Sequence, residues 1–336
     1  MSATVPAVIN RRYELVERLG EGAQGAVFAA RDRLFPQRAL ALKVVSARVS
    51  EALSRFEFAE LARFEHPHLA RVFDLGRVEE AEGDDPPSKG AMFFTQERVP
   101  GVRADAWSAA LQEDVRYPAV ARVGVAVARA LAALHGRDLL HRDVKPSNIL
   151  VGGGADEPTV KLIDLGLAGR VGGVDGIRAG TLGYMAPEAL AGFADERSDL
   201  YSLGAALASL ATGRPPRAAT GSLDEPAHPA QPAFWDIVRR LTAPRPADRF
   251  DSAREVVLAL GRAFGSEILG GGRDGEVIDA ASEADDAASR RSRWRSAELV
   301  GRRVELDAFT AAVREALSRG ARWPGLVFVA GPAGVG

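Results

Sequence analysis

A polar stretch from His141 to Leu150 restricts the folds open to this chain more than any other sequence feature. Within eight positions it holds a carboxylate, an ammonium group and an amide, which belong to Asp143, Lys145 and Asn148. Pro146 interrupts helix formation and biases the residue before it toward an extended backbone, so these side chains should lie on an irregular loop. The apolar residues from Ile149 to Val151 predict a buried strand directly after the loop. A polar loop on a rigid strand is suited to catalysis, and these groups indicate phosphate and metal chemistry.

Length and composition limit what surrounds this loop. The chain has 336 residues, more than an average single domain, and its 46% apolar and 26% charged residues are typical of a soluble globular protein. The formal charge of -2 argues against nucleic acid or an anionic membrane as a partner. The absence of cysteine excludes disulfides, thiolate metal sites and a catalytic thiol. The N-terminus lacks a signal pattern, and we find no run of about 18 apolar residues, so we expect a cytoplasmic protein with no membrane span in this chain.

Three apolar-rich runs near the N-terminus predict an antiparallel meander, at Tyr13 to Leu19, Ala26 to Arg31 and Ala39 to Val45. The first connection, Gly20 to Gly25, is glycine-rich, and the missing Cβ atoms let backbone N–H groups approach phosphate oxygens. Alone this pattern is weak, because a flexible hairpin has the same composition. Lys43 lies among apolar residues of the third run, so its charge needs a partner.

A partner for Lys43 is available on a predicted helix from Ser50 to Glu65. Glu57 and Glu60 both lie on the apolar stripe of this helix. Periodicity does not choose between them.

The same periodicities predict the later elements. A strand from Thr159 to Ile163 ends at Asp164, and a helix from Glu196 to Thr212 places Asp199 on its core-facing stripe. The other predicted elements are a strand at Ala91 to Gln96, a helix near Pro118 to His135 stopped by Gly136, and a helix from Asp251 to Phe264 capped by Gly265.

Four segments together resemble the signature of the eukaryotic-type (Hanks-type) protein kinase family, in particular its bacterial serine/threonine kinases. They are the loop at His141 to Leu150, the glycine loop followed by Ala41-Leu42-Lys43, the triplet Asp164-Leu165-Gly166, and Gly180 to Glu188. The resemblance covers about residues 12–264 and implies an α+β, two-lobed kinase-like fold. It places an antiparallel β N-lobe with one helix at 12–96, a hinge at 97–101 and a mainly helical C-lobe at 102–264, after an N-terminal tail at 1–11.

The resemblance also implies ATP and Mg²⁺ as ligands and assigns roles to single residues. Asp143 would orient the substrate hydroxyl and accept its proton, while Lys145 and Lys43 neutralise and grip phosphoryl groups. Asn148 and Asp164 would hold magnesium. In the family the glutamate that pairs with the strand lysine precedes a His-Pro pair by nine residues, so His66-Pro67 selects Glu57, with Glu60 as the alternative.

The ATP site implied by the resemblance runs from the glycine loop to the hinge. Gln96 would be the gatekeeper, the residue at the back of that site, and the backbone of Glu97 and Val99 would hydrogen-bond adenine. The full set is Leu19, Gly20, Glu21, Gly22, Ala23, Gln24, Gly25, Val27, Ala41, Lys43, Glu57, Gln96, Glu97 and Val99. Two departures from the family are Gln24, where an aromatic residue is frequent, and Leu165, where phenylalanine is.

Two structural roles follow from the same resemblance. Asp199 would anchor the backbone of the polar loop, and Arg249 would pair with the carboxylate of Glu188. Lys145 supports specificity for serine and threonine, because tyrosine kinases usually lack a lysine there.

The C-terminal part of the chain has a different character. Residues 265–295 are rich in Gly, Ala, Ser, Asp and Arg and predict a flexible linker. Residues 296–336 resemble the truncated start of an AAA-type signalling ATPase: a helix to about Arg319 and a strand at Gly325 to Ala330 lead into Gly331 to Gly336. That glycine segment stops before the Lys-Ser/Thr pair that would complete a phosphate-binding loop.

We therefore expect a serine/threonine protein kinase that transfers the γ-phosphoryl group of ATP to protein substrates in bacterial-type signalling, with possible coupling to the downstream ATPase segment. The main alternative is a pseudokinase that binds nucleotide and controls the downstream ATPase. A further alternative makes the chain mainly an ATPase with a kinase-fold sensor. Retention of all five polar identities, at His141, Arg142, Asp143, Lys145 and Asn148, argues against the pseudokinase.

Overall fold

In the computed structural model the structure describes residues 7–22, 25–45, 58, 62, 64–83, 86–164, 169–170, 181–216 and 231–269. All of them belong to the first of two units into which the chain divides, Met1–Gly270. The predicted helix at Ser50 to Glu65 lies mostly outside the described residues. The predicted ATPase segment lies wholly outside them, as does the predicted linker beyond Leu269.

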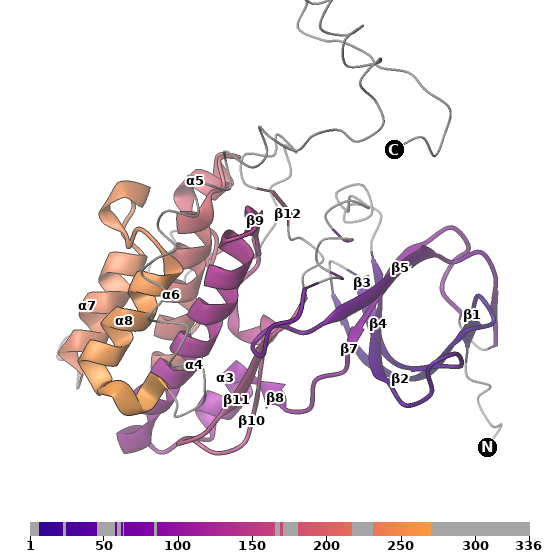
Figure 1. The fold of residues 1–336 in the computed structure, drawn as a ribbon, viewed down its shortest axis with the longest axis horizontal. Helices are drawn as coiled ribbons and strands as arrows, with labels where there is room; N and C mark the ends of the chain where they lie inside the picture. Colours follow the sequence, from indigo (N-terminus) through magenta and orange to yellow (C-terminus); the bar gives the residue numbers. More distant parts are fainter. Residues whose placement is uncertain are drawn as a thin grey trace, which may run out of the picture. The chain divides into compact units, whose positions relative to one another are not determined.

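The N-terminal part of the domain forms a curled antiparallel sheet, on the right in Figure 1. Its seven strands have the order β5-β7-β4-β3-β2-β1-β6. They are β1 (Val8–Ile9), β2 (Tyr13–Gly22), β3 (Gly25–Asp32), β4 (Ala39–Val45), β5 (Val72–Arg77), β6 (Ala81–Glu82) and β7 (Met92–Glu97). The three predicted strands of the meander are confirmed as β2, β3 and β4. The short strands β1 and β6 were not predicted, because two-residue strands are too short to show alternation.

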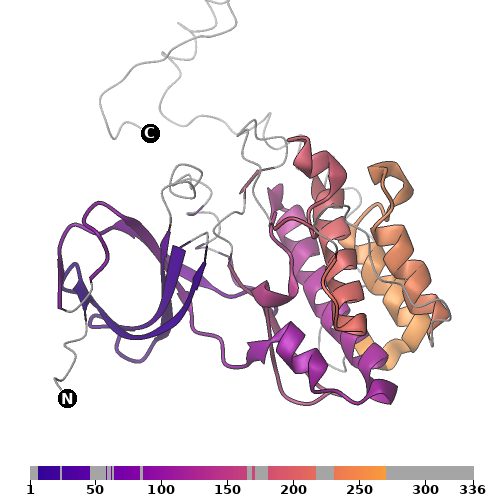
Figure 2. The same cartoon turned by 180° about the vertical axis from the view of Figure 1, so that it is seen from behind.

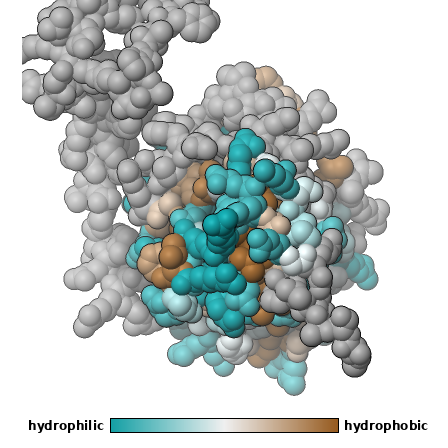
Figure 3. Space-filling model, turned by 90° about the vertical axis from the view of Figure 1, so that its right-hand side faces the viewer, coloured by the Kyte–Doolittle hydropathy of each residue, from teal (hydrophilic) through white to brown (hydrophobic). Residues whose placement is uncertain are grey.

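The two faces of this sheet belong to different cores. Leu40 and Leu42 of β4 pack with Phe93 of β7 in one apolar cluster on one face. On the other face Phe94 packs against Phe58, in a second cluster that continues into the helical part of the domain. The surface at the strand end of the molecule is largely hydrophilic, with small separate apolar patches (Figure 3).

The second part of the domain is mainly helical, on the left in Figure 1 and on the right in Figure 2. Its helices are α3 (Ala104–Ala109), α4 (Glu113–His135), α5 (Pro187–Leu190), α6 (Glu196–Thr212), α7 (Pro232–Leu241) and α8 (Ala253–Phe264). Helix α4 runs through the centre. A Cβ at its Gly124 would lie 3.1 Å from the side chains of Leu207 and Leu260, so α6 and α8 approach it closely.

The start of α4 corrects one sequence prediction, and its end confirms another, since the helix stops at His135 with Gly136 as its C-cap. The helix begins at Glu113, not near Pro118, because the proline lies only one turn from the helix start and its missing N–H removes a single hydrogen bond. Gly136 is right-handed (φ -61), and the left-handed residue after the helix is Asp138 (φ 58). Among the described residues α4 is also the one helix long and apolar enough to cross a membrane, although we expected no such run. Since 67% of its most apolar window is buried, α4 is here the core helix of the domain.

Small sheets hold the polar loop between the two parts. Strand β10 (Ile149–Gly152) pairs with β11 (Thr159–Leu162) and with β8 (Val102–Arg103). Strand β9 (Leu139–Leu140) pairs with β12 (Gly169–Arg170). The turn η1 (Pro146–Asn148) leads directly into β10, and Lys145 before it is extended, as the sequence predicted.

The packed chain continues past the end of α8. Gly265 is left-handed (φ 93), and the turn η4 (Ser266–Leu269) follows it. Ile268 is buried, and Arg129 of α4 donates a hydrogen bond to the Leu269 carbonyl (2.8 Å). The first residues of the predicted linker are therefore part of the domain, because an apolar side chain there finds a place in the core.

Candidate active site

The backbone of the polar loop is fixed by Asp199 of α6. Its carboxylate accepts hydrogen bonds from the backbone N–H groups of His141 and Arg142, each at 2.8 Å, and from His135 Nε2 at 2.9 Å. Arg142 is left-handed (φ 66), a conformation that costs about 1–3 kcal/mol in a residue other than glycine. Burial raises the pKa of Asp199, but the hydrogen bonds and charges of His135 and His141 together outweigh it and lower that pKa. Asp199 thus stays ionised and offsets the strain at Arg142.

His135 is a site residue that the sequence analysis missed. It ends α4 and lies 64 positions before Asp199, so only packing of α4 against α6 brings them together. A buried histidine at the end of an apolar helix was the one available signal.

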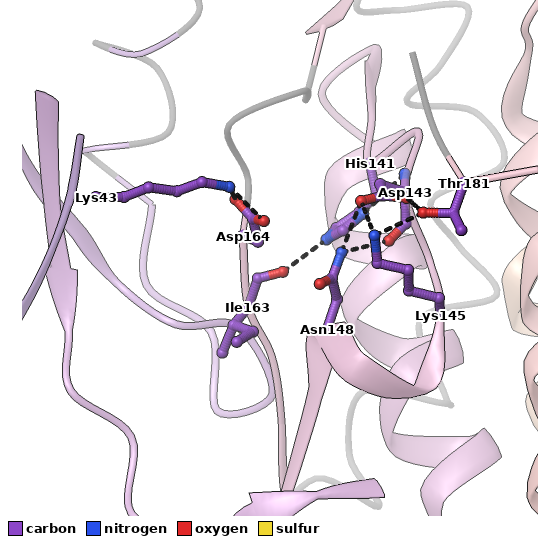
Figure 4. A network of polar contacts seen from close by, with 8 residues as sticks. All are labelled: Lys43, His141, Asp143, Lys145, Asn148, Ile163, Asp164 and Thr181. Carbon is purple, nitrogen blue, oxygen red and sulfur yellow. Dashed lines mark hydrogen bonds and ion pairs between the residues drawn. The ribbon is translucent and has the colours of Figure 1, made fainter. Parts of the chain in front are cut away.

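His141 links the loop to the strand that carries Asp164. Its Nδ1 accepts the backbone N–H of Asp143 (3.3 Å), so the ring proton lies on Nε2, which donates to the Ile163 carbonyl (3.2 Å). The Ile163 N–H in turn donates to the Asn148 carbonyl (2.8 Å). The residue before Asp164 is thus tied to both ends of the polar loop (Figure 4).

The carboxylate of Asp143 lies at the centre of a buried polar cluster (Figure 4). Lys145 Nζ (2.7 Å) and Asn148 Nδ2 (2.9 Å) donate to Oδ2, and Thr181 Oγ1 (3.0 Å) donates to Oδ1. Lys145 Nζ also donates to Thr181 Oγ1 at 2.6 Å. The structure therefore brings together the three polar residues of the loop and adds Thr181 from the segment before α5.

Lys43 and Asp164 form an ion pair across the two parts of the domain. Lys43 Nζ lies 2.6 Å from both carboxylate oxygens of Asp164. Lys43 is buried, and Asp164 is left-handed (φ 68) at the end of β11. The two predicted partners of Lys43, Glu57 and Glu60, lie outside the described residues, so that pairing stays a prediction.

The glycine loop is the end of the ribbon formed by β2 and β3. Gly22 pairs with Gly25. At Gly25 a Cβ would overlap the Val44 carbonyl oxygen and φ is 130°, so Gly25 has to be glycine. Leu19 and Gly20 to Gly22 are exposed, whereas Val27 is half-buried. Ala23 and Gln24 lie outside the described residues.

The strand face that carries Lys43 continues toward the hinge. Ala41 stands two residues before Lys43 and lies opposite Gln96 of β7 in the sheet. Gln96 is 6% exposed, and its Oε1 has no hydrogen-bond partner among the described residues. The Glu97 carboxylate instead turns to Lys161 Nζ (2.7 Å), and Val99 is half-buried in the irregular segment that follows.

The predicted pair of Arg249 with Glu188 is present. Arg249 Nη1 and Nη2 bind the two carboxylate oxygens at 2.6 Å and 2.9 Å, and Arg249 is fully buried. This pair joins α5 to the turn η3 (Pro246–Asp248) before α8.

Comparison with known proteins places this geometry in a family. The protein kinase domain family matches residues 13–257 of the chain. The chain belongs to the protein kinase family. The kinase-like fold expected from the sequence, with a β N-lobe and a helical C-lobe, is thereby confirmed, and members of this family use ATP and Mg²⁺.

The similar proteins are named bacterial serine/threonine kinases. PknF of Mycobacterium tuberculosis is 33% identical over 320 residues, which cover 86% of this chain and 63% of PknF. The DNA damage-responsive kinase RqkA of Deinococcus radiodurans is 38% identical over 228 residues, which cover 64% of this chain and 32% of RqkA. The crystal structure of the M. tuberculosis PknI kinase domain aligns with a TM-score of 0.56 at 28% identity, over 79% of this chain and 100% of that domain. The chain thus spans less than two thirds of the length of the curated relatives.

The residues expected to hold magnesium in this kinase domain have suitable chemistry. Magnesium prefers oxygen ligands. Asn148 donates through Nδ2 to Asp143, so its Oδ1 keeps no hydrogen-bond partner within the described ranges. The Asp164 side chain is 15% exposed, and its counter-charge among the described residues is Lys43. One carboxylate and one amide oxygen on neighbouring strand ends fit a magnesium ion that keeps water and phosphate ligands.

Proposed function

We propose that this chain is a serine/threonine protein kinase that transfers the γ-phosphoryl group of ATP to hydroxyl groups of protein substrates in bacterial signalling. One observation carries the proposal: the Asp143 carboxylate is buried, yet held by a lysine, an amide and a threonine hydroxyl. A buried carboxylate needs such donors to stay ionised, and only the ionised form accepts a proton.

In this mechanism Asp143 orients the substrate hydroxyl and accepts its proton. Lys145 uses two of its three ammonium protons on Asp143 and Thr181, and its charge would offset the negative charge of the transferring phosphoryl group. Lys43 would grip the α- and β-phosphates, with Glu57 as its partner when nucleotide draws it away from Asp164. Asn148 and Asp164 would hold Mg²⁺, which supplies charge neutralisation on the phosphates when bound.

The nucleotide base is proposed to lie between the glycine loop and the hinge. Support comes from the glycine requirement at Gly25 and from the shared strand face of Ala41, Lys43 and Gln96. The other proposed contacts are Leu19, Gly20, Glu21, Gly22, Ala23, Gln24, Val27, Glu97 and Val99.

Transfer of radiolabelled phosphate from ATP to a generic protein substrate tests the proposal. Asp143→Asn keeps the size of the side chain but removes the base, and it should lose most of the transfer. Asp248→Asn, at an exposed aspartate far along the chain, is the matched control. Nucleotide binding without transfer in the unaltered protein would favour the pseudokinase alternative.

We further propose that residues 270–295, beyond the η4 turn, are a linker and that residues 296–336 open an AAA-type ATPase domain to which the kinase couples. The support is the sequence pattern alone. We also propose a cytoplasmic location from the sequence pattern, and the burial of α4 in the core of the domain agrees with it.

A further inference from the structure

A pocket of about 370 Å³ lies beside the Asp143 cluster. Lys145 and Thr181, which both bind the Asp143 carboxylate, form part of its wall. The pocket and the carboxylate therefore share two residues. A polypeptide that presents a serine or threonine hydroxyl to Asp143 must run past the opening of this pocket, since flanking residues lie only 3.3–3.6 Å apart per residue along an extended chain.

Among the described residues that line the pocket, the charged ones are Arg103, Asp105 and Lys145, and each is in an ion pair; the rest of the lining is uncharged. Apolar groups of Pro146 and Leu210 line it, together with the hydroxyl groups of Ser147, Tyr184 and Ser209. The Tyr184 and Ser209 hydroxyls lie 3.2 Å apart and bind each other. An uncharged substrate side chain meets apolar contacts and hydroxyls here without loss of an ionic partner.

Two carboxylates of the described residues lie at the pocket, and both have cationic partners. Asp143 is bound by Lys145. Arg103 and Asp105 line the pocket, and Arg103 binds Asp105 through two hydrogen bonds, Nε to Oδ1 at 3.1 Å and Nη2 to Oδ2 at 2.5 Å. Burial raises the pKa of the Tyr184 phenol above its ordinary value, and Asp105 and Arg103, which line the same pocket, act on that pKa in opposite directions.

We infer that the Arg103–Asp105 pair cancels the charge of this pocket and makes the kinase select substrates with an uncharged side chain beside the phosphoacceptor hydroxyl. The inference rests on the proposed kinase function. The pair is largely exposed, at 59% and 44%, where an ion pair adds little to stability. Its substitution should therefore change substrate choice without unfolding the protein.

Peptides with one serine and neutral flanks, altered at one flanking position at a time to Gln, Lys or Glu, test the inference on the full chain. For the unaltered protein, kcat/KM should be highest with Gln at the position that enters the pocket. Arg103→Ala exposes the Asp105 carboxylate and should raise kcat/KM for the Lys peptide relative to the Gln peptide by about three- to fivefold. Asp105→Asn leaves the Arg103 charge exposed and should raise kcat/KM for the Glu peptide relative to the Gln peptide by a similar factor.

The double variant Arg103→Ala with Asp105→Asn should restore the preference for Gln, because neither charge remains. Arg245→Ala is the matched control, since Arg245 and Asp248 form an exposed two-bond pair outside the pocket. The gains should shrink at high ionic strength, where exposed charges are screened. Unchanged charge preference in both single variants, or a tenfold preference of the unaltered protein for Lys or Glu, would overturn the inference.

Fluorescence anisotropy with the same peptides separates this inference from the proposed function. If phosphate transfer is absent but peptide binding follows the predicted charge preferences, the pocket assignment stands and the kinase activity falls. If transfer occurs but the Arg103 and Asp105 variants show no shift in charge preference, the kinase activity stands and the pocket assignment falls.

Discussion

At the residue scale, Lys43 and Asp164 are each other's counter-charge in this structure, with Nζ 2.6 Å from both carboxylate oxygens. Lys43→Met and Asp164→Ala should each reduce phosphate transfer by about 10²-fold or more, because they act on phosphate and metal placement. Both variants should stay folded, with the far-ultraviolet circular dichroism of the unaltered protein, although Asp164→Ala should melt at a lower temperature because it removes the carboxylate bound to the buried Lys43 charge. Lys89→Met, at an exposed lysine, is the control and should keep full transfer. Full activity in either site variant would refute the kinase assignment.

Gln96 gives a second prediction at this scale. Its buried Oε1 has no hydrogen-bond partner among the described residues, and an unsatisfied buried acceptor is destabilising. Gln96→Met removes the acceptor at similar volume, so the free energy of unfolding of the nucleotide-free protein should rise by about 1 kcal/mol. Urea denaturation measures this. A loss of stability would mean that the amide oxygen is satisfied in solution.

At the scale of elements, the Arg249–Glu188 pair joins α5 to the turn before α8, and Ser198 of α6 also donates to Glu188 at 2.7 Å. Burial raises the pKa of Glu188, but the hydrogen bonds from Arg249 and Ser198 outweigh it and hold this pKa below its ordinary value of 4.5. Because the folded-state pKa is lowered, the stabilisation is complete above the unfolded-state pKa. It is lost as the pH falls through the folded-state pKa.

Glu188→Gln should therefore lower the free energy of unfolding at pH 7 by about 3 kcal/mol, since it leaves the buried Arg249 charge without its partner. The variant should also lose less stability than the unaltered protein as the pH falls below about 4.5. Urea denaturation between pH 7 and pH 3 measures both effects. Asp248→Asn, at an exposed pair, is the control and should change little. Parallel acid profiles for the unaltered protein and Glu188→Gln would contradict the assignment.

At the scale of the whole molecule, the segment between Gly166 and Gly180 contains no serine, threonine or tyrosine. A phosphate that orders this segment through Arg142 therefore has no acceptor there. The next hydroxyl, Thr181, is already bound to Asp143 and Lys145, and a phosphate on it would disrupt that cluster.

Phosphatase-treated protein should accordingly keep its transfer activity from the first minute of assay. The measurement is a progress curve for treated and untreated protein, with mass spectrometry of residues 167–184. A lag that prior incubation with ATP abolishes, together with a phosphate in that range, would contradict the prediction.

The sequence by itself determined the elements whose signals are local. Pro146 before an apolar run specified an irregular turn and then a strand, and β2, β3 and β4 follow their alternation. Helix α6 has the predicted bounds Glu196–Thr212, because its apolar stripe is long and its ends are marked by Asp195 as N-cap and Gly213 as C-cap. The polar identities at Asp143, Lys145 and Asn148 were evident from their crowding within one short loop, and Asp164 was found from the family resemblance.

Only the tertiary structure decided which distant groups meet. His135 reaches Asp199 because α4 packs on α6, and Thr181 completes the Asp143 cluster from 38 residues away. Tertiary packing also decided where α4 starts, that Gln96 is buried, and that a pocket forms beside the Arg103–Asp105 pair. Periodicity records which face of an element is buried, but not what packs against it. Partners that depend on the packing of separate elements therefore leave no signal in periodicity, and the two that were expected, Asp199 with the polar loop and Arg249 with Glu188, came from the family resemblance.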